Sequence, residues 1–405
     1  MFRDINQAIA FIESQVTGQV DFIEFKEIYN KYKRKHQPFY IHVTGTNGKG
    51  STAKMFSDVL RNANYKVGLF TSPHMEVSND RVRINNEYIS NQNLLNYIND
   101  LYTDIIKYNI NFFQIYTLIA LLYFQDQACE FAIIEVGIGG LYDSTNVIDA
   151  KLAIITNISL DHTEKLGKSI KDIAYNKAGI IKDNSFVLTH VEDEVALAEI
   201  RKVVSQTNSQ LNILGDIESS LEDGERVFMI DGMTYHLENP AIYQVKNAQI
   251  VIAAIKHLNS LGYNIAQEIL VASLKAFTWS GRYEVINQDP LVILDGAHNI
   301  AGIKALIATA PKDALIIFAA MKDKDYQIML DLLVANFTEV VFVEFNYYRA
   351  LKASDLIGIK SFESAKSAYA YYLDKYPNKT VIFCGSLYFV SEVSNNRRDI
   401  IDTNN

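Results

Sequence analysis

The chain has 405 residues, of which 49% are hydrophobic and 21% charged, and its net charge at pH 7 is −9. This length predicts two domains, and this composition is typical of a soluble globular protein rather than a disordered one. The acidic balance argues against general binding of nucleic acid, whose phosphates attract lysine and arginine. An anionic substrate would therefore need local clusters of basic side chains.

Cysteine content and apolar runs indicate the compartment. Cys129 and Cys384 are the only cysteines and lie within or beside apolar runs, which argues against a disulfide framework or a thiolate metal site. The first residues lack a secretory apolar block, and the apolar run over residues 115–124 is shorter than the ~20 residues that cross a bilayer. We expect a cytoplasmic protein that does not enter the membrane.

Strand-like runs alternate with helical patterns along the first half of the chain. Because the runs are apolar nearly from end to end, we expect strands that are buried on both faces of a mostly parallel sheet. These predicted strands are residues 39–43, 66–70, 131–136, 151–158 and 185–189.

The first of these strands leads into a glycine-rich sequence, residues 42–52, followed by a helical pattern. Glycines let the backbone approach phosphate oxygens, and the N–H groups at a helix start favour negative charge. Lys49 can then reach the outer phosphates of a nucleoside triphosphate, and the Ser51 hydroxyl can bind Mg²⁺. Only two residues separate Gly45 from Gly48, so this is a variant of the commonest phosphate loop. A purely structural turn is the alternative.

Polar side chains follow two more of the predicted strands. Glu135 ends one apolar run directly before a glycine-rich turn, and His162 follows the strand predicted at residues 151–158. Because open α/β sheets bind ligands at the carboxyl ends of their strands, Lys49, Glu135 and His162 are expected to converge there. The carboxylate and a neutral imidazole could complete a Mg²⁺ or Mn²⁺ site. A salt bridge for Glu135 and a structural role for His162 remain open.

Beyond residue 215 the pattern changes twice. Short alternating runs such as residues 226–230 predict a small antiparallel excursion, and helical periodicity returns over residues 247–258. A second series then predicts strands at 291–295, 314–320, 339–345 and 380–385, and helices at 300–310, 326–337 and 364–376. Residues 280–290 are the candidate linker, and residues 395–405 are expected to fray. We predict an α/β protein with an N-terminal P-loop-type, mostly parallel ATPase domain over residues 1–284 and a smaller Rossmann-like domain over residues 285–405.

Seven blocks in this order resemble the folylpolyglutamate synthase family of the Mur ligase superfamily: residues 42–52, 71–74, 135–146, 161–163, 177–180, 281–284 and 295–299. The resemblance implies an ATP-dependent ligase that adds L-glutamate to the γ-carboxylate tail of a reduced folate. In that reaction the γ-phosphoryl group of ATP activates the carboxylate as an acyl phosphate, the glutamate amine attacks, and ADP and phosphate leave.

The resemblance also implies roles at the matching positions. ATP would be bound by Thr46, Asn47, Gly48, Lys49, Gly50, Ser51, Asn247 near the adenine, Arg282 near the phosphates and Asp295 on the ribose. Two Mg²⁺ ions would be held by Ser51, Ser72, Glu135 and His162, together with a carbamate formed from Lys177 and CO₂. Folate would contact Phe113, Gln114, Tyr142, Asp143 and Ser144, and the incoming glutamate would contact His298, Ser386 and Tyr388. Lys49, Lys177, His162 and His298 are the candidate catalytic residues.

Several positions depart from the family pattern. Gln114 stands where relatives have a carboxylate, Leu141-Tyr142 replaces an Arg-Leu pair, Asn176 a glutamate, Tyr243 a histidine and Ser280 a proline. The triphosphate and magnesium positions are intact, so the acceptor is less determined than the phosphoryl chemistry. The alternatives are a bifunctional enzyme that also makes dihydrofolate, a nucleotide-binding relative with weakened turnover, and a simple ATPase or kinase. The expected partners are small molecules (reduced folate, L-glutamate and ATP) and not nucleic acid or membrane, and the expected state is a monomer.

Overall fold

The computed structural model describes residues 1–16, 18 and 20–401. They form two compact units that interleave along the chain. Unit 1 comprises Met1–Ile217 and Lys246–Leu274, and unit 2 comprises Glu218–Val245 and the chain from Lys275 onward. The predicted boundary between an ATPase domain over residues 1–284 and a Rossmann-like domain over residues 285–405 stays a prediction.

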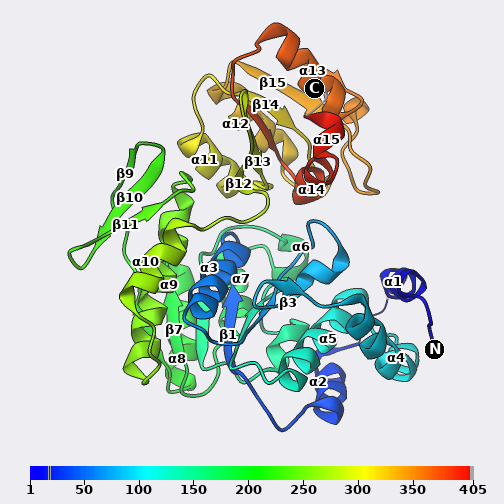
Figure 1. The fold of residues 1–405 in the computed structure, drawn as a ribbon, viewed down its shortest axis with the longest axis vertical. Coiled ribbons are helices and arrows are strands. Elements are labelled where there is room, and N and C mark those ends of the chain that lie inside the picture. Colours follow the sequence, from blue (N-terminus) through cyan, green and yellow to red (C-terminus); the bar gives the residue numbers. More distant parts are fainter. Residues whose placement is uncertain (17, 19, 402–405) are drawn as a thin grey trace. The chain divides into compact units, whose positions relative to one another are not determined.

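Unit 1 is built on an eight-stranded sheet in the order β4-β3-β2-β5-β1-β6-β7-β8. Figure 1 labels strands β1, β3 and β7 of this sheet. The strands from β2 to β8 in that order run parallel, while β3 and β4 add an antiparallel edge. Every residue of β2, β5 and β6 is buried, which confirms the predicted strands with two covered faces. The bounds are β1 Phe39–Thr44, β2 Val67–Phe70, β3 Val82–Ile84, β4 Glu87–Tyr88, β5 Phe131–Glu135, β6 Leu152–Ile155, β7 Phe186–Thr189 and β8 Gln210–Ile213.

The helices of unit 1 follow the predicted pattern of strand and crossover. They are α1 Ile5–Glu13, α2 Phe22–Tyr32, α3 Lys49–Asn62, α4 Asn91–Tyr108, α5 Phe112–Asp126, α6 Thr163–Leu166, α7 Ile170–Ala178, α8 Glu194–Gln206, α9 Tyr243–Ser260 and α10 Gln267–Lys275, with 3₁₀ turns η1 Ser78–Arg81 and η2 Ser144–Val147. Helix α9 contains the second crossing of the chain between the units. No helix in the described ranges is both long enough and apolar enough to span a bilayer.

Unit 2 contains two sheets. The antiparallel sheet β11-β10-β9 (β9 Ser219–Glu222, β10 Glu225–Ile230, β11 Met233–Leu237) confirms the predicted excursion. The six-stranded sheet has the order β12-β13-β17-β14-β15-β16, and all its pairs are parallel except β12 with β13. Its elements are β12 Arg282–Gln288, β13 Leu291–Asp295, α11 Ile300–Thr309, β14 Leu315–Phe318, α12 Tyr326–Asn336, β15 Glu339–Val343, η3 Ala353–Asp355, β16 Ser361–Phe362, α13 Ala365–Lys375, β17 Val381–Cys384, α14 Leu387–Asn395 and α15 Arg397–Ile400.

Two sequence predictions about irregular segments are wrong. The predicted linker at residues 280–290 holds strand β12, because its turn-forming residues lie at the bulge and at the hairpin turn rather than in a linker. The predicted fraying of residues 395–405 fails as far as Ile401, since α15 forms there and both Ile400 and Ile401 are buried. Residues 402–405 lie outside the described part.

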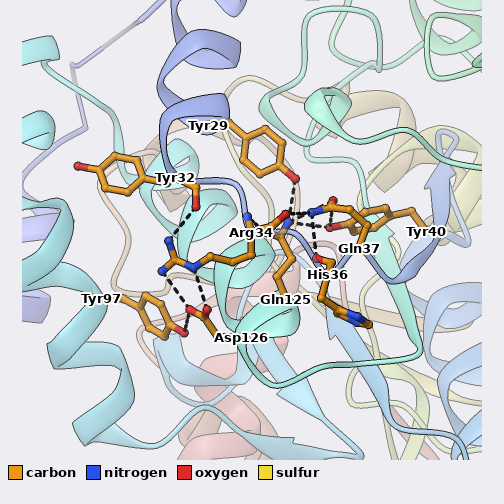
Figure 2. A network of polar contacts seen from close by, with 9 residues as sticks. All are labelled: Tyr29, Tyr32, Arg34, His36, Gln37, Tyr40, Tyr97, Gln125 and Asp126. Atoms are coloured by element: carbon orange, nitrogen blue, oxygen red, sulfur yellow. Dashed lines mark hydrogen bonds and ion pairs between the residues drawn. The ribbon is translucent and has the colours of Figure 1, made fainter.

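A polar network anchors the connection that leads into β1 (Figure 2). The guanidinium of Arg34 donates to both carboxylate oxygens of Asp126 at 2.8 and 3.1 Å, and its backbone N–H donates to Gln125 Oε1 at 2.8 Å. Gln125 Nε2 in turn donates to the hydroxyls of Tyr29 and Tyr40, at 2.8 and 2.9 Å. The buried end of α5 therefore fixes both the end of α2 and the start of β1.

Replacing Gln125 with leucine should remove three of these hydrogen bonds at nearly constant volume. Because Tyr29 and Tyr40 are buried, the loss should lower the free energy of unfolding by about 2 kcal/mol. Urea-induced unfolding measures the change. Gln127→Leu, an exposed position two residues later, is the control and should leave the unfolding midpoint unchanged. Equal effects of the two substitutions would contradict the assignment.

Three histidines of unit 1 have lowered pKa values, chiefly because of burial. The pKa of His42 lies well below 6.5, and those of His74 and His190 are lowered to about 4; Lys182, Arg81 and Lys246 respectively add repulsion. Neither ring nitrogen of His190 has a hydrogen-bond partner among the described residues, and the neighbouring Gln249 Oε1 also lacks one. These side chains are held neutral in the folded state.

A histidine that stays neutral in the fold makes stability fall at acid pH. In the unfolded chain His190 is protonated below about pH 6.5, whereas in the folded protein it is protonated only below about pH 4. Protonation between these two pH values therefore favours the unfolded chain, and the stability present above pH 6.5 is progressively lost as the pH falls. His190→Leu should therefore gain about 1 kcal/mol relative to the unaltered protein between pH 7.5 and 5.5. Urea unfolding at both pH values measures this gain. A difference that is the same at both pH values would contradict the prediction.

Candidate active site

The glycine-rich loop lies between β1 and α3, at the centre of the large sheet. Gly45 has φ +150°, and a Cβ there would lie 1.8 Å from Thr156 Oγ1. Gly48 has φ +84° and forms the N-cap of α3, so the first N–H groups of that helix face outward without intrahelical partners. Only glycine suits either position. The loop therefore offers a backbone that can accept an anion, as the sequence predicted.

Residues that follow β6 hold this loop in shape. Asn157 pairs with Asn47 in both directions, because its Oδ1 accepts from Asn47 N at 3.0 Å and its Nδ2 donates to Asn47 O at 2.9 Å. The Thr156 hydroxyl donates to the same carbonyl at 2.6 Å, and Thr46 N donates to Asn157 O at 3.0 Å. The sequence analysis missed this function of Asn157. The available signal was its place directly after the strand that pairs with β1.

A small cavity opens beside the loop. It is lined by Gly45, Thr46, Lys49, Gly137, Ile138, Gly139, Asp161, His162, Leu166 and Lys177. The structure thus brings together Lys49, which follows β1, with His162 and Lys177, which both lie in the crossover between β6 and β7. Glu135 ends β5 in register with Val43 of β1, and its Oε2 accepts from Ser72 N at 3.0 Å. The expected convergence at one sheet edge is present, while the individual roles stay predictions.

Lys177 is buried, with 3% of its surface exposed, so it is not a solvated lysine on the face of its helix. Its Nζ donates to Gly45 O at 2.8 Å. Burial, reinforced by the charge of Lys49, lowers the pKa of Lys177 to about 7. A large fraction of this side chain is therefore a neutral, nucleophilic amine at physiological pH.

Lys49 and Ser51 lie at the start of α3. Lys49 Nζ donates to two carbonyls of its own loop, Gly45 O at 3.0 Å and Thr46 O at 3.1 Å. The Ser51 hydroxyl is buried and has no hydrogen-bond partner among the described residues. A buried oxygen without a partner is costly unless a ligand satisfies it, and an oxygen-binding cation such as Mg²⁺ would do so. The donor set of Ser51 with the nearby Glu135 carboxylate fits that ion.

A buried chain of hydrogen bonds braces the glycine-rich turn after β5. Asp143 accepts from Ile138 N at 3.0 Å, and from the backbone N–H of Thr145 at 3.0 Å and its hydroxyl at 2.5 Å. The Thr145 hydroxyl gives its only proton to Asp143, so the 2.9 Å contact with His42 is a bond donated by the imidazole Nε2–H. Both carboxylate oxygens of Asp143 therefore hold the turn that lines the cavity.

None of the five predicted folate residues is among the residues that line the cavity. Phe113 packs against Phe70, and a Cβ on Gly137 would lie 2.6 Å from its ring. Gln114 caps α5 and donates from Nε2 to Val20 O at 2.9 Å, and the Ser144 hydroxyl bonds that of Thr117 at 3.0 Å. Tyr142 is exposed to 68%. Their contact with folate stays a prediction.

The remaining predicted residues lie in both units. Asn247, in unit 1, accepts from the Thr52 hydroxyl at 3.3 Å and packs against Gly48. In unit 2, Asp295 ends β13 in register with Arg282, and His298 Nδ1 lies 2.7 Å from Gly296 O. Ser386 follows β17, and Tyr388 stacks on Tyr347 with ring centroids 4.3 Å apart. These five residues of unit 2 follow or flank the carboxyl ends of β13 and β17.

Comparison with known proteins identifies the family. Residues 43–255 match the Mur ligase middle domain, and residues 281–387 match the Mur ligase glutamate ligase domain. The chain is 34% identical over 381 residues to a dihydrofolate synthase/folylpolyglutamate synthase of Bacillus subtilis, covering 87% of this chain and 89% of that protein. It is also 34% identical to a folylpolyglutamate synthase of Lacticaseibacillus casei, covering 89% and 90% of the two chains.

Solved structures agree with this result. The apo form of L. casei FPGS matches with a TM-score of 0.84 and 29% identity, covering 97% of this chain and 99% of that chain. E. coli FolC in complex with DHPP and ADP matches with a TM-score of 0.85 and 27% identity, covering 97% and 98%. The phosphate loop, the strand-end polar residues and the matches along nearly the whole chain show that this protein belongs to the folylpolyglutamate synthase family of Mur ligases.

Proposed function

We propose that this protein is an ATP-dependent ligase that adds L-glutamate to the γ-carboxylate tail of a reduced folate and releases ADP and phosphate. The observation that carries the proposal is a cavity that the phosphate loop lines together with His162 and Lys177. Relatives have been solved with an ATP analogue and folate, and with ADP and DHPP, which supports a site for a nucleotide and a pterin-bearing acid.

The residues of the loop suit activation of a carboxylate. Such a group is a poor electrophile because it is anionic and lacks a leaving group, so transfer of a phosphoryl group to it must come first. Backbone N–H groups at the start of α3 would bind the transferred phosphates, and Lys49 would exchange its loop carbonyls for phosphate oxygens. His298, Ser386 and Tyr388 would bind the incoming glutamate, whose amine completes the amide.

Mg²⁺ is part of the proposal. Ser51, Ser72, Glu135 and His162 would hold two such ions, which supply charge neutralisation on the phosphates when bound. The buried, unpartnered hydroxyl of Ser51 supports one of these ions directly. For the second, we propose that the neutral amine of Lys177 adds CO₂, loses a proton and becomes a carbamate whose carboxylate helps to bind it.

We propose further that the protein acts as a cytoplasmic monomer on small molecules alone. The net charge of −9 supports the exclusion of nucleic acid as a partner. Size-exclusion chromatography with light scattering tests the oligomeric state, and a mass of about twice 45.8 kDa would overturn the monomer.

The reaction is tested with purified protein, ATP, L-glutamate and either tetrahydrofolate or dihydropteroate. Mass spectrometry should find a gain of one glutamyl unit on tetrahydrofolate, with ADP release that depends on glutamate. A gain of one glutamyl unit on dihydropteroate as well would identify the bifunctional enzyme. The B. subtilis relative is named as such a bifunctional enzyme, which supports this alternative. ADP without an amide product would identify an ATPase or kinase, and nucleotide binding without either would identify a weakened relative.

Ser51→Ala should separate metal binding from folding. Because the hydroxyl has no partner among the residues that the structure describes, its removal should leave thermal stability nearly unchanged, while Mg²⁺-dependent affinity for ATP should fall about tenfold or more. Isothermal titration with and without Mg²⁺ measures this. Ser57→Ala is the control, since Ser57 lies on the same helix and its hydroxyl is also buried without a partner. An equal loss of affinity in both variants would contradict the assignment.

Carbamate formation at Lys177 should be visible directly. In ¹³C-bicarbonate the protein should show a carbamate carbon signal by NMR, and Lys177→Met should abolish it. Lys182→Met is a matched control, because Lys182 is also largely buried and its pKa is lowered to about 8. A signal that persists in Lys177→Met, or disappears only in Lys182→Met, would contradict the modification of Lys177.

A further inference from the structure

The carboxylate of Asp295 accepts hydrogen bonds from three donors of the protein. Its Oδ2 accepts from the Tyr243 hydroxyl at 2.7 Å and from Tyr283 N at 3.1 Å, and its Oδ1 accepts from Ala297 N at 2.9 Å. A carboxylate oxygen has two lone-pair directions. Oδ2 is therefore saturated by the protein, whereas Oδ1 retains capacity for one further donor.

The bond from Tyr283 N to Asp295 depends on a strained backbone conformation at Tyr283. Tyr283 has φ +53°, a conformation that side-chain-bearing residues rarely adopt, and it lies at a register shift between β12 and β13. This bulge turns Tyr283 N toward the carboxylate. Strain of this kind persists only where the surroundings fix it, and it concentrates at functional sites.

Tyr243 is the donor that comes from outside the β12–β13 hairpin. It is the first residue of α9 and lies 52 residues from Asp295 along the chain. Without its hydroxyl, Oδ2 would keep only the longer bond from Tyr283 N. The terminal torsion of an aspartate is broad, so the carboxylate plane would then be less well defined.

We propose that Tyr243 is a positioning residue for the nucleotide sugar: its hydroxyl fixes the Asp295 carboxylate so that Oδ1 is aimed at a ribose hydroxyl. This inference rests on the proposed function and on the contact between Asp295 and the ribose of ATP that the family resemblance implies. Fixing an acceptor before binding spares the cost of ordering it on binding. The ligand chemistry that is recognised is a sugar hydroxyl donor.

The protonation of Tyr243 supports this role. Burial, together with the negative charge of Asp295, raises the pKa of the Tyr243 hydroxyl well above 10. The group therefore remains a neutral donor at any pH at which the enzyme would be assayed. A phenolate in its place would repel the carboxylate that it holds.

The experiment compares ATP with 2′,3′-dideoxy-ATP, which lacks both ribose hydroxyls. Tyr243→Phe should weaken binding of ATP about tenfold but leave binding of the dideoxy nucleotide nearly unchanged, so the preference for the ribose should largely disappear. The KM for folate and for glutamate should stay the same. Tyr372→Phe is the matched control, since this buried tyrosine of unit 2 donates to Ile316 O at 3.2 Å and should keep the full preference.

A purely structural role of Tyr243 predicts a different result. Equal weakening of both nucleotides, or a loss of thermal stability like that of Tyr372→Phe with the ribose preference intact, would overturn the proposal. Should Tyr243→Phe not fold, Tyr243→Met, which also lacks a donor, takes its place, and an unchanged ribose preference there would overturn it as well.

Nucleotide binding is measured without turnover, so a failure of the proposed role of Tyr243 can be distinguished from a failure of the proposed ligase function. A wild-type protein that prefers ATP over the dideoxy nucleotide but forms no glutamyl product would overturn the proposed ligase function and leave the role of Tyr243 standing.

Discussion

Two lysines converge on one carbonyl oxygen, and the chemistry of the site depends on that arrangement. Gly45 O accepts from Lys49 Nζ at 3.0 Å and from Lys177 Nζ at 2.8 Å, in a place where Lys177 is almost completely buried. Two full positive charges so close together are unfavourable without an anion, which is why the charge of Lys49 helps to lower the pKa of Lys177. The pair favours an anionic ligand and leaves one amine available for reaction.

The loop that carries Gly45 is held from outside rather than by its own sequence. Asn157 and Thr156 bond to Asn47 O, and Asp143 fixes the neighbouring turn from β5 with the help of Thr145 and His42. The central strand β1 thus ends between two braces, one from each strand beside it. This places most of the rigidity in buried side chains, with the backbone N–H groups of Thr46 and Asn47 engaged by Asn157.

Much of the fold was predictable, because buried parallel strands are apolar on both faces and leave a clear signal. Strands β1, β5 and β13 were predicted to within a residue at each end. Short antiparallel additions such as β4, with two exposed residues, leave no such signal, and β12 was mistaken for a linker because bulge and turn residues dominate its composition. The burial of Lys177 and the bond from His42 to Thr145 join residues more than a hundred positions apart, so no local pattern could predict them.

Two residues that depart from the family pattern, Gln114 and Tyr243, make hydrogen bonds that account for their side chains. At position 114 the amide both accepts a bond from Asn111 N and donates one to Val20 O. A carboxylate could not make the second bond, so glutamine at this position joins the start of α5 to the N-terminal segment. In the same way Tyr243 brings a hydroxyl to Asp295. Substituted positions therefore carry structural functions of their own.

The interleaving of the two units constrains how the protein is made and divided. Unit 1 resumes at Lys246 after the β9–β11 excursion and ends only at Leu274, so a single cut after Leu274 keeps unit 1 whole but takes residues 218–245 away from unit 2. During synthesis the large sheet emerges from the ribosome early, but it must wait for α9 and α10 before its unit is finished. Recombination between relatives at that one point would leave unit 2 a mixture of two parents, and exchange of either unit alone requires three junctions.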